Sequence, residues 1–87
     1  MFVILTYDIE EKKINRVRKI LKKYLTWTQN SVFEGEITEG KLHKCLSEVS
    51  RNIDKRTDSI YIYTVKMTHN IKKDIIGVEK NFNELFI

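Results

Sequence analysis

Two apolar runs and two amphipathic stretches alternate along this chain of 87 residues. The first run, Phe2–Tyr7, is apolar and rich in β-branched residues, which is typical of a buried central strand. The second run, Ser59–Met67, reads SIYIYTVKM and is equally rich in strand-forming Ile, Tyr and Val. Both runs are therefore predicted to be strands of one sheet.

The two amphipathic stretches are predicted to be helices. In the first, which extends to about Leu25, the apolar stripe consists of Ile14, Val17, Leu21 and Tyr24 or Leu25. Asp8 directly precedes this stretch and fits an N-cap, with Glu11 three residues later in the capping-box position. The second helix is predicted from about Glu39 to Ile53. Its apolar stripe consists of Leu42, Cys45, Leu46, Val49 and Ile53.

Three further segments have strand character. Thr26–Ile37 lacks a helical period and predicts one or two strands, with a turn near Gln29–Asn30 or at Gly35. Asp74–Val78 predicts a short strand, and the apolar tail NFNELFI ends the chain.

The order β-α-β(β)-α-β is that of a ferredoxin-like α+β fold, βαββαβ, in which an antiparallel sheet carries two helices on one face. We expect an additional C-terminal strand. The predicted organisation is a ferredoxin-like domain at 1–78 and a tail at 79–87 whose strand pairs with a partner subunit.

Two helices on one face leave the other face of the sheet uncovered. Along Ser59–Met67, apolar residues occupy both alternating sets of positions, so both faces of this strand need a cover. In so short a chain the second cover is predicted to be another chain. The apolar tail fits pairing with that neighbour, and we therefore predict a symmetric homodimer.

The net charge of +4 arises from 16 basic and 12 acidic residues, and the positive charge is concentrated in the first helix. Seven cations lie between Glu10 and Leu25: Lys12, Lys13, Arg16, Arg18, Lys19, Lys22 and Lys23. Only Glu10 and Glu11 oppose them, so the acidic partners of a solvated helix are missing. This pattern predicts contact with the phosphates of a nucleic acid.

Other features narrow the class of protein. No apolar run approaches the roughly 20 residues of a membrane span, and no signal peptide is apparent. The single cysteine, Cys45, falls on an apolar stripe and reads as a core residue. His43 and His69 are not favoured as ligands or bases. We expect a soluble cytoplasmic domain that does not associate with membranes.

Asp8 is the one carboxylate that a predicted strand end would hold rigidly, and two interpretations of it are open. It is either the N-cap of the first helix or a ligand of Mg²⁺, which one or two carboxylates and substrate phosphates can hold. A two-fold axis near this strand end would bring two copies of Asp8 together, so that only the dimer would form the site. Bound Mg²⁺ would polarise a phosphodiester and activate water. Trp27 fits packing or, alternatively, stacking on a base.

A first strand ending in Tyr7-Asp8, a basic first helix and the sequence NSVFEGE together resemble the small CRISPR-associated endonuclease family. Its members are the smaller of the two near-universal proteins of CRISPR spacer acquisition. The resemblance covers essentially the whole chain, including Ile75–Gly77 and the apolar tail. The most informative motif is SVFEG, at Ser31–Gly35.

The resemblance implies a ferredoxin-like homodimer whose C-terminal strand crosses to the partner. It implies that Asp8 of both subunits binds Mg²⁺ and that the protein cleaves single-stranded RNA or, as in some members, double-stranded DNA. It also implies that the dimer bridges two dimers of the larger CRISPR integrase subunit along protospacer DNA. Tyr7, Arg16, Ser31 and Phe33 match positions near the active cleft of the family.

The residues and the resemblance together leave two functions open. The first is a Mg²⁺-dependent endonuclease, with Asp8, Tyr7, Ser31 and Phe33 at the catalytic site and Lys12, Lys13, Arg16, Lys19 and Lys23 binding nucleic acid. The second is a non-catalytic DNA-binding scaffold of the integration complex, since one positioned Asp and no obvious base indicate slow cleavage or none. A regulatory dimer that binds no nucleic acid is a third, generic alternative.

Overall fold

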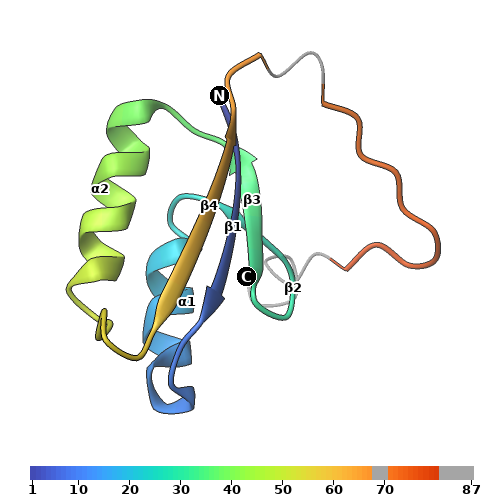
Figure 1. Ribbon diagram of the computed structural model, residues 1–87. Coiled ribbons are helices and arrows are strands. Elements are labelled where there is room, and N and C mark those ends of the chain that lie inside the picture. Colours follow the sequence, from blue (N-terminus) through green and yellow to red (C-terminus); the bar gives the residue numbers. More distant parts are fainter. Residues whose placement is uncertain (68–70, 81–87) are drawn as a thin grey trace.

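The computed structural model describes residues 1–67 and 71–80, and two helices lie on one side of its four-stranded antiparallel sheet (Figure 1). The elements are β1 (Phe2–Asp8), a 3-10 turn η1 (Glu11–Lys13), α1 (Ile14–Leu21), β2 (Thr26–Gln29), β3 (Val32–Glu36), α2 (Glu39–Ser50) and β4 (Ser59–Val65). The order β2-β3-β1-β4 places β1 at the centre, between β3 and β4. The predicted βαββαβ order and ferredoxin-like α+β fold are confirmed.

The core lies between the sheet and the two helices. Alternate residues of β1 are buried on the helix side, and Leu5 pairs with Phe33 on one neighbouring strand and Ile62 on the other. The buried hydrophobic residues are Val3, Leu5, Tyr7, Val17, Leu21, Leu25, Phe33, Ile37, Leu42, Cys45 and Val49. The predicted stripes of both helices are thus confirmed. Burial raises the pKa of the Cys45 thiol to about 11, as expected for an unreactive core cysteine.

The predicted N-cap at Asp8 is wrong. The strand β1 continues through Asp8, which lies opposite Ser59 of β4, and η1 begins three residues later without a side-chain cap. At its N-cap residue, Glu10, the backbone N–H donates to Oδ1 of Asp58 at 3.0 Å. A carboxylate distant in the sequence therefore satisfies the N–H group of the observed N-cap residue, in place of the local capping box expected at Asp8 and Glu11.

The structure differs from the sequence prediction at the helix ends and defines the position of the hairpin turn. Both helices are shorter than predicted, since α1 ends at Leu21 and α2 at Ser50. The segment Thr26–Ile37 contains two strands, β2 and β3, and Asn30 has a φ of +32° at the turn between them. A left-handed φ is tolerated by Asn better than by most residues, which explains why the turn falls at the predicted Gln29–Asn30 position.

The sheet face opposite the helices remains open along its β4 edge. Tyr61 and Tyr63 are 57% and 56% exposed, and they pair with Thr6 and Ile4 of β1. Val65 is also exposed. The prediction that a single chain leaves apolar side chains uncovered on this face is confirmed.

The predicted strand at Asp74–Val78 is wrong, because residues 71–80 form no strand and Gly77 has a φ of +101°. This segment arcs away from the end of β4 (Figure 1), and near its start Lys73 forms an ion pair with Glu34 of β3. Of the predicted tail strand, residues 81–87 lie outside the described residues. Within 1–67 and 71–80, each helix is too short or too polar to span a bilayer.

Candidate functional site

Asp8 occupies an exposed position at the end of the central strand. Ser59 of β4 lies opposite, and on the other side the Tyr7 N–H donates to the Ser31 carbonyl at 3.1 Å. Within residues 1–67 and 71–80, no hydrogen bond or ion pair engages the Asp8 carboxylate. Two neighbouring strands thus hold the backbone while the carboxylate stays accessible to a hard cation.

The hydroxyl of Tyr7 stabilises the nearby hairpin turn. It accepts a hydrogen bond from Nε of Arg18 at 2.7 Å and donates one to the Asn30 carbonyl at 3.3 Å. The same carbonyl accepts from Nη2 of Arg18 at 3.2 Å and from the Trp27 indole at 2.8 Å. Arg18 also lies 4.3 Å from the centre of the Trp27 ring. These contacts fix the turn that carries Ser31.

Of the predicted catalytic residues, the structure brings Tyr7, Asp8 and Ser31 together at one end of the sheet. Phe33 lies beneath them, fully buried, with its ring 6.1 Å from Trp27 and 6.3 Å from Tyr7. Phe33 is therefore positioned to support the site through packing, because nucleic acid cannot reach its ring in this chain. The stacked Trp27–Phe33 pair agrees with the packing interpretation of Trp27.

A metal ion at Asp8 would take its remaining ligands from water, from substrate or from a second copy of the chain. No group of three or more His, Cys, Asp or Glu side chains in the described part of the chain could hold a metal ion. Asp8 alone nevertheless fits Mg²⁺ chemically, because Mg²⁺ keeps several waters and accepts one or two carboxylates together with phosphate oxygens. The donor set is therefore suited to a site completed by a second Asp8 or by substrate.

Asp58, which sequence reasoning missed, stabilises the chain just after Asp8 and the loop that leads into β4. Its buried carboxylate accepts hydrogen bonds from the N–H groups of Glu10 and Asp54 at 3.0 and 2.8 Å, and from the Lys13 ammonium at 2.7 Å. The Asp54 N–H and then Lys13 lower the pKa of this carboxyl to about 2. A signal existed in the sequence, since Asp58 directly precedes a predicted strand. Interpreting it requires the register that places Ser59 opposite Asp8.

The five predicted nucleic-acid ligands fall into two groups. Arg16 and Lys19 are exposed and form no ion pair within residues 1–67 and 71–80, and Lys12 is exposed beside Glu10 at 3.5 Å. These three are available to phosphates. By contrast, Lys13 is only 20% exposed and is bound to Asp58.

Lys23 is the second of the five predicted nucleic-acid ligands that is held by a carboxylate distant in the sequence. It forms a 2.6 Å ion pair with Glu48 of α2, and Tyr24 donates a hydrogen bond to the same carboxylate at 2.6 Å. That hydrogen bond raises the pKa of Tyr24 to about 12. Lys23 therefore helps to join α1 to α2, a contact that helical periodicity does not predict.

Sequence comparison places the chain in a family. The family model described as CRISPR associated protein Cas2 matches residues 1–73. A protein of Thermodesulfovibrio yellowstonii named CRISPR-associated endoribonuclease Cas2 3 is 57% identical over 79 residues, covering 91% of this chain and 90% of the relative. The CRISPR-associated endoribonuclease Cas2 of Thermotoga maritima is 45% identical over 80 residues, covering 92% of each chain.

Solved structures agree with the sequence relatives. A Cas2 crystal structure superposes with a TM-score of 0.71 at 38% identity, covering 92% of this chain and 90% of the other. A hypothetical protein from Thermus thermophilus, TT1823, superposes with a TM-score of 0.78 at 26% identity, covering 91% and 93%. The YD strand end, the SVFEG hairpin and the fold thus agree with the match over residues 1–73. The chain belongs to the Cas2 family of CRISPR-associated proteins.

Proposed function

We propose that this protein is a Mg²⁺-dependent endonuclease of CRISPR spacer acquisition that hydrolyses phosphodiester bonds in single-stranded RNA, with double-stranded DNA as a second candidate substrate. The observation that carries the proposal is the exposed Asp8 carboxylate, which has no partner in the described part of the chain and ends the central strand. The relatives named endoribonuclease support this class of reaction.

The proposed site is shared between two subunits. Asp8 of each copy binds the metal, and bound Mg²⁺ supplies polarisation of the phosphodiester and a more acidic water. Asp58 orients the backbone that flanks Asp8, since it binds Glu10 and immediately precedes Ser59. Tyr7 and Arg18 hold the adjacent turn, from which Ser31 contacts the substrate. Arg16 and Lys19 bind backbone phosphates.

The homodimer is supported by the open sheet face. A single chain leaves Tyr61, Tyr63 and Val65 exposed there, and a second copy would bury them. The dimer would also bridge two dimers of the larger CRISPR integrase subunit, and the protein would act in the cytoplasm. The bridging role rests on the family resemblance, and the cytoplasmic location on the sequence features given above.

Substitution of Asp8 tests the catalytic proposal. Asp8→Asn removes the charge that a hard cation requires but keeps the size of the side chain. With Mg²⁺ we expect cleavage of single-stranded RNA to fall at least 100-fold, roughly the effect of removing a group that stabilises the transition state. A matched control is Glu11→Gln, another exposed carboxylate of the same segment, which should cleave like wild type. EDTA should abolish cleavage by both active proteins.

A second candidate function is a DNA-binding scaffold without catalysis. It is favoured by the accessible cations of α1 together with the single Asp8 carboxylate that each chain offers at this end. The same experiment separates the two functions. A scaffold would bind duplex DNA equally well as wild type and as Asp8→Asn, and neither highly purified protein would cleave. Cleavage by Asp8→Asn at the wild-type rate would assign any nuclease activity to other residues.

A further inference from the structure

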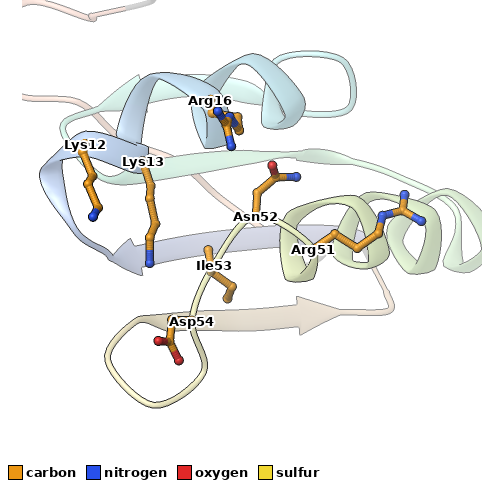
Figure 2. Close-up of a pocket in the computed structure, with 7 residues that line it drawn as sticks. All are labelled: Lys12, Lys13, Arg16, Arg51, Asn52, Ile53 and Asp54. Atoms are coloured by element: carbon orange, nitrogen blue, oxygen red, sulfur yellow. The ribbon is translucent and has the colours of Figure 1, made fainter.

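A groove lies between the start of α1 and the end of α2 (Figure 2). It has a volume of about 430 Å³ and is lined by Lys12, Lys13, Arg16, Arg51, Asn52, Ile53 and Asp54. Figure 2 shows Lys12, Lys13 and Arg16 on η1 and α1, and Arg51 directly after α2, with Asn52 between Arg16 and Arg51 in this view. Cations therefore border the groove from two separate elements.

The acidic groups around this groove already have partners. Both carboxylate oxygens of Asp54 accept hydrogen bonds from Arg56, at 3.1 and 3.0 Å. Asp58 is neutralised by Lys13, and Glu10 lies 3.5 Å from Lys12. The positive charge of the groove is thus concentrated on two guanidinium groups.

Those two groups, Arg16 and Arg51, form no ion pair or hydrogen bond through their side chains within residues 1–67 and 71–80. Two uncompensated cations that border one groove favour the entry of an anion into it. Guanidinium groups bind phosphate oxygens with two parallel N–H donors, which an ammonium group cannot do.

The floor of the groove is held in place. Nδ2 of Asn52 donates to the Glu48 carbonyl at 2.8 Å, so the loop that follows α2 is attached to the last turns of the helix. Arg51 itself is the C-cap residue of α2. Its purely structural role would be to compensate the negative end of the helix dipole.

We propose that this groove binds a phosphate group between Arg16 and Arg51. The phosphate belongs either to a nucleic-acid backbone or to a free nucleotide. In the first case, the nucleic-acid contacts proposed for α1 extend across to the end of α2, and Arg51 is an additional nucleic-acid ligand. The inference rests on the binding part of the proposed function and is independent of cleavage.

Fluorescence anisotropy with a labelled single-stranded RNA in EDTA tests this inference without any contribution from metal or cleavage. We expect Arg51→Gln and Arg16→Gln each to weaken binding about tenfold and to reduce the salt dependence by about one phosphate contact. The matched control is Lys41→Gln, which removes one exposed charge from the opposite end of the same helix. It should change affinity less than twofold. The double variant should lose less than the product of the single effects, because both residues bind one phosphate.

A nucleoside monophosphate, added as competitor, distinguishes the two sources. If the nucleotide displaces RNA from wild type but not from Arg51→Gln, the groove is a nucleotide site. If only longer strands displace RNA, the groove binds a nucleic-acid backbone. The proposal is overturned if Arg51→Gln binds RNA as Lys41→Gln does. The proposal is also overturned if Arg51→Gln lowers the melting temperature but leaves RNA affinity unchanged, because Arg51 would then only compensate the helix dipole. Because the assay contains EDTA, it measures binding without cleavage, so loss of cleavage and loss of groove binding are separable.

Discussion

Oδ1 of Asp58 accepts a hydrogen bond from the backbone N–H of Glu10 at 3.0 Å, although 48 residues separate the two in sequence. The other oxygen binds the Lys13 ammonium at 2.7 Å. A buried carboxylate is tolerated when charged and polar donors satisfy it in this way. Because Asp8 is two residues before Glu10 and opposite the neighbour of Asp58, this bond stabilises the end of the sheet at which the proposed catalytic carboxylate lies.

Replacing Asp58 with Asn should destabilise the fold. The amide cannot accept all the hydrogen bonds made by the carboxylate, and the Lys13 charge would lose its buried partner. We expect the melting temperature at neutral pH, followed by circular dichroism, to fall by roughly 10 °C. The control is Asp74→Asn, whose exposed carboxylate lies 3.8 Å from Lys72 and should have little effect. Equal melting temperatures for the two variants would contradict the stabilising role of Asp58.

The same carboxylate predicts a dependence of stability on pH. Its pKa is lowered from about 3.8 to about 2 in the folded chain, so the folded state favours the ionised form. The resulting stabilisation is fully present above the unfolded pKa and is lost as the pH falls through the folded pKa. The difference in melting temperature between wild type and Asp58→Asn should therefore be constant above pH 5 and shrink between about pH 4 and pH 2. A difference independent of pH across this window would be inconsistent with the account.

Replacing Lys12 and replacing Lys13 should have different effects, although the two residues are neighbours in sequence. The Lys13 side chain is 20% exposed and bound to Asp58, whereas that of Lys12 is 78% exposed. We expect Lys13→Gln to lower the melting temperature by roughly 5 °C. Lys12→Gln should leave melting unchanged and weaken RNA binding with a smaller salt slope. The opposite pattern, measured by thermal melting and anisotropy, would show that the two roles are exchanged.

Phe33 is expected to act through packing. Phe33→Ala should cost about 3–5 kcal/mol, since it removes a fully buried ring beneath Tyr7 and Trp27. Phe33→Leu keeps most of the volume and should cost about 1.5 kcal/mol or less. Urea denaturation measures both values. If Phe33→Leu remains folded but loses RNA cleavage, then Phe33 has a direct role at the site and the packing assignment is wrong.

The open sheet face predicts self-association. Light scattering of the full chain should show a dimer at micromolar concentrations, and replacing both Tyr61 and Tyr63 with Ser should weaken it. Deleting Phe82–Ile87 should weaken it as well if the tail pairs with the partner. The control replaces Ser47, which is exposed on α2, with Ala. A folded wild-type monomer at these concentrations would contradict the dimer proposal.

Local patterns were sufficient to predict most of the fold. The stripes that contain Val17 and Cys45 reflect burial on one face of each helix, which a periodic pattern records directly. The run Ser59–Met67 predicted β4 through its strand-forming residues, although most of them are exposed in a single chain. The capping role of Asp8 could not be judged in this way. Its alternative, the extension of β1 to pair with Ser59, depends on a strand 51 residues later in the chain.

The candidate site was predictable only in part, for the same reason. Asp8 is identified by its place after an apolar run, but the partners of Asp58 and the groove position of Arg51 follow from strand register and helix packing. The basic pattern of the first helix likewise does not distinguish Lys19, which is accessible, from Lys23, which is paired with Glu48 of another helix. Long-range partners decide which charges remain available.

The most direct test of the central claim is a subunit-mixing experiment with wild type and Asp8→Asn. The two proteins are denatured together in equal amounts and refolded, and the rate of Mg²⁺-dependent RNA cleavage is compared with that of wild type alone at the same total concentration. If two copies of Asp8 share one Mg²⁺, only dimers with two wild-type subunits are active, and the rate should be about a quarter of the wild-type rate. A rate of about half would show that each Asp8 acts within its own subunit and would contradict the shared site.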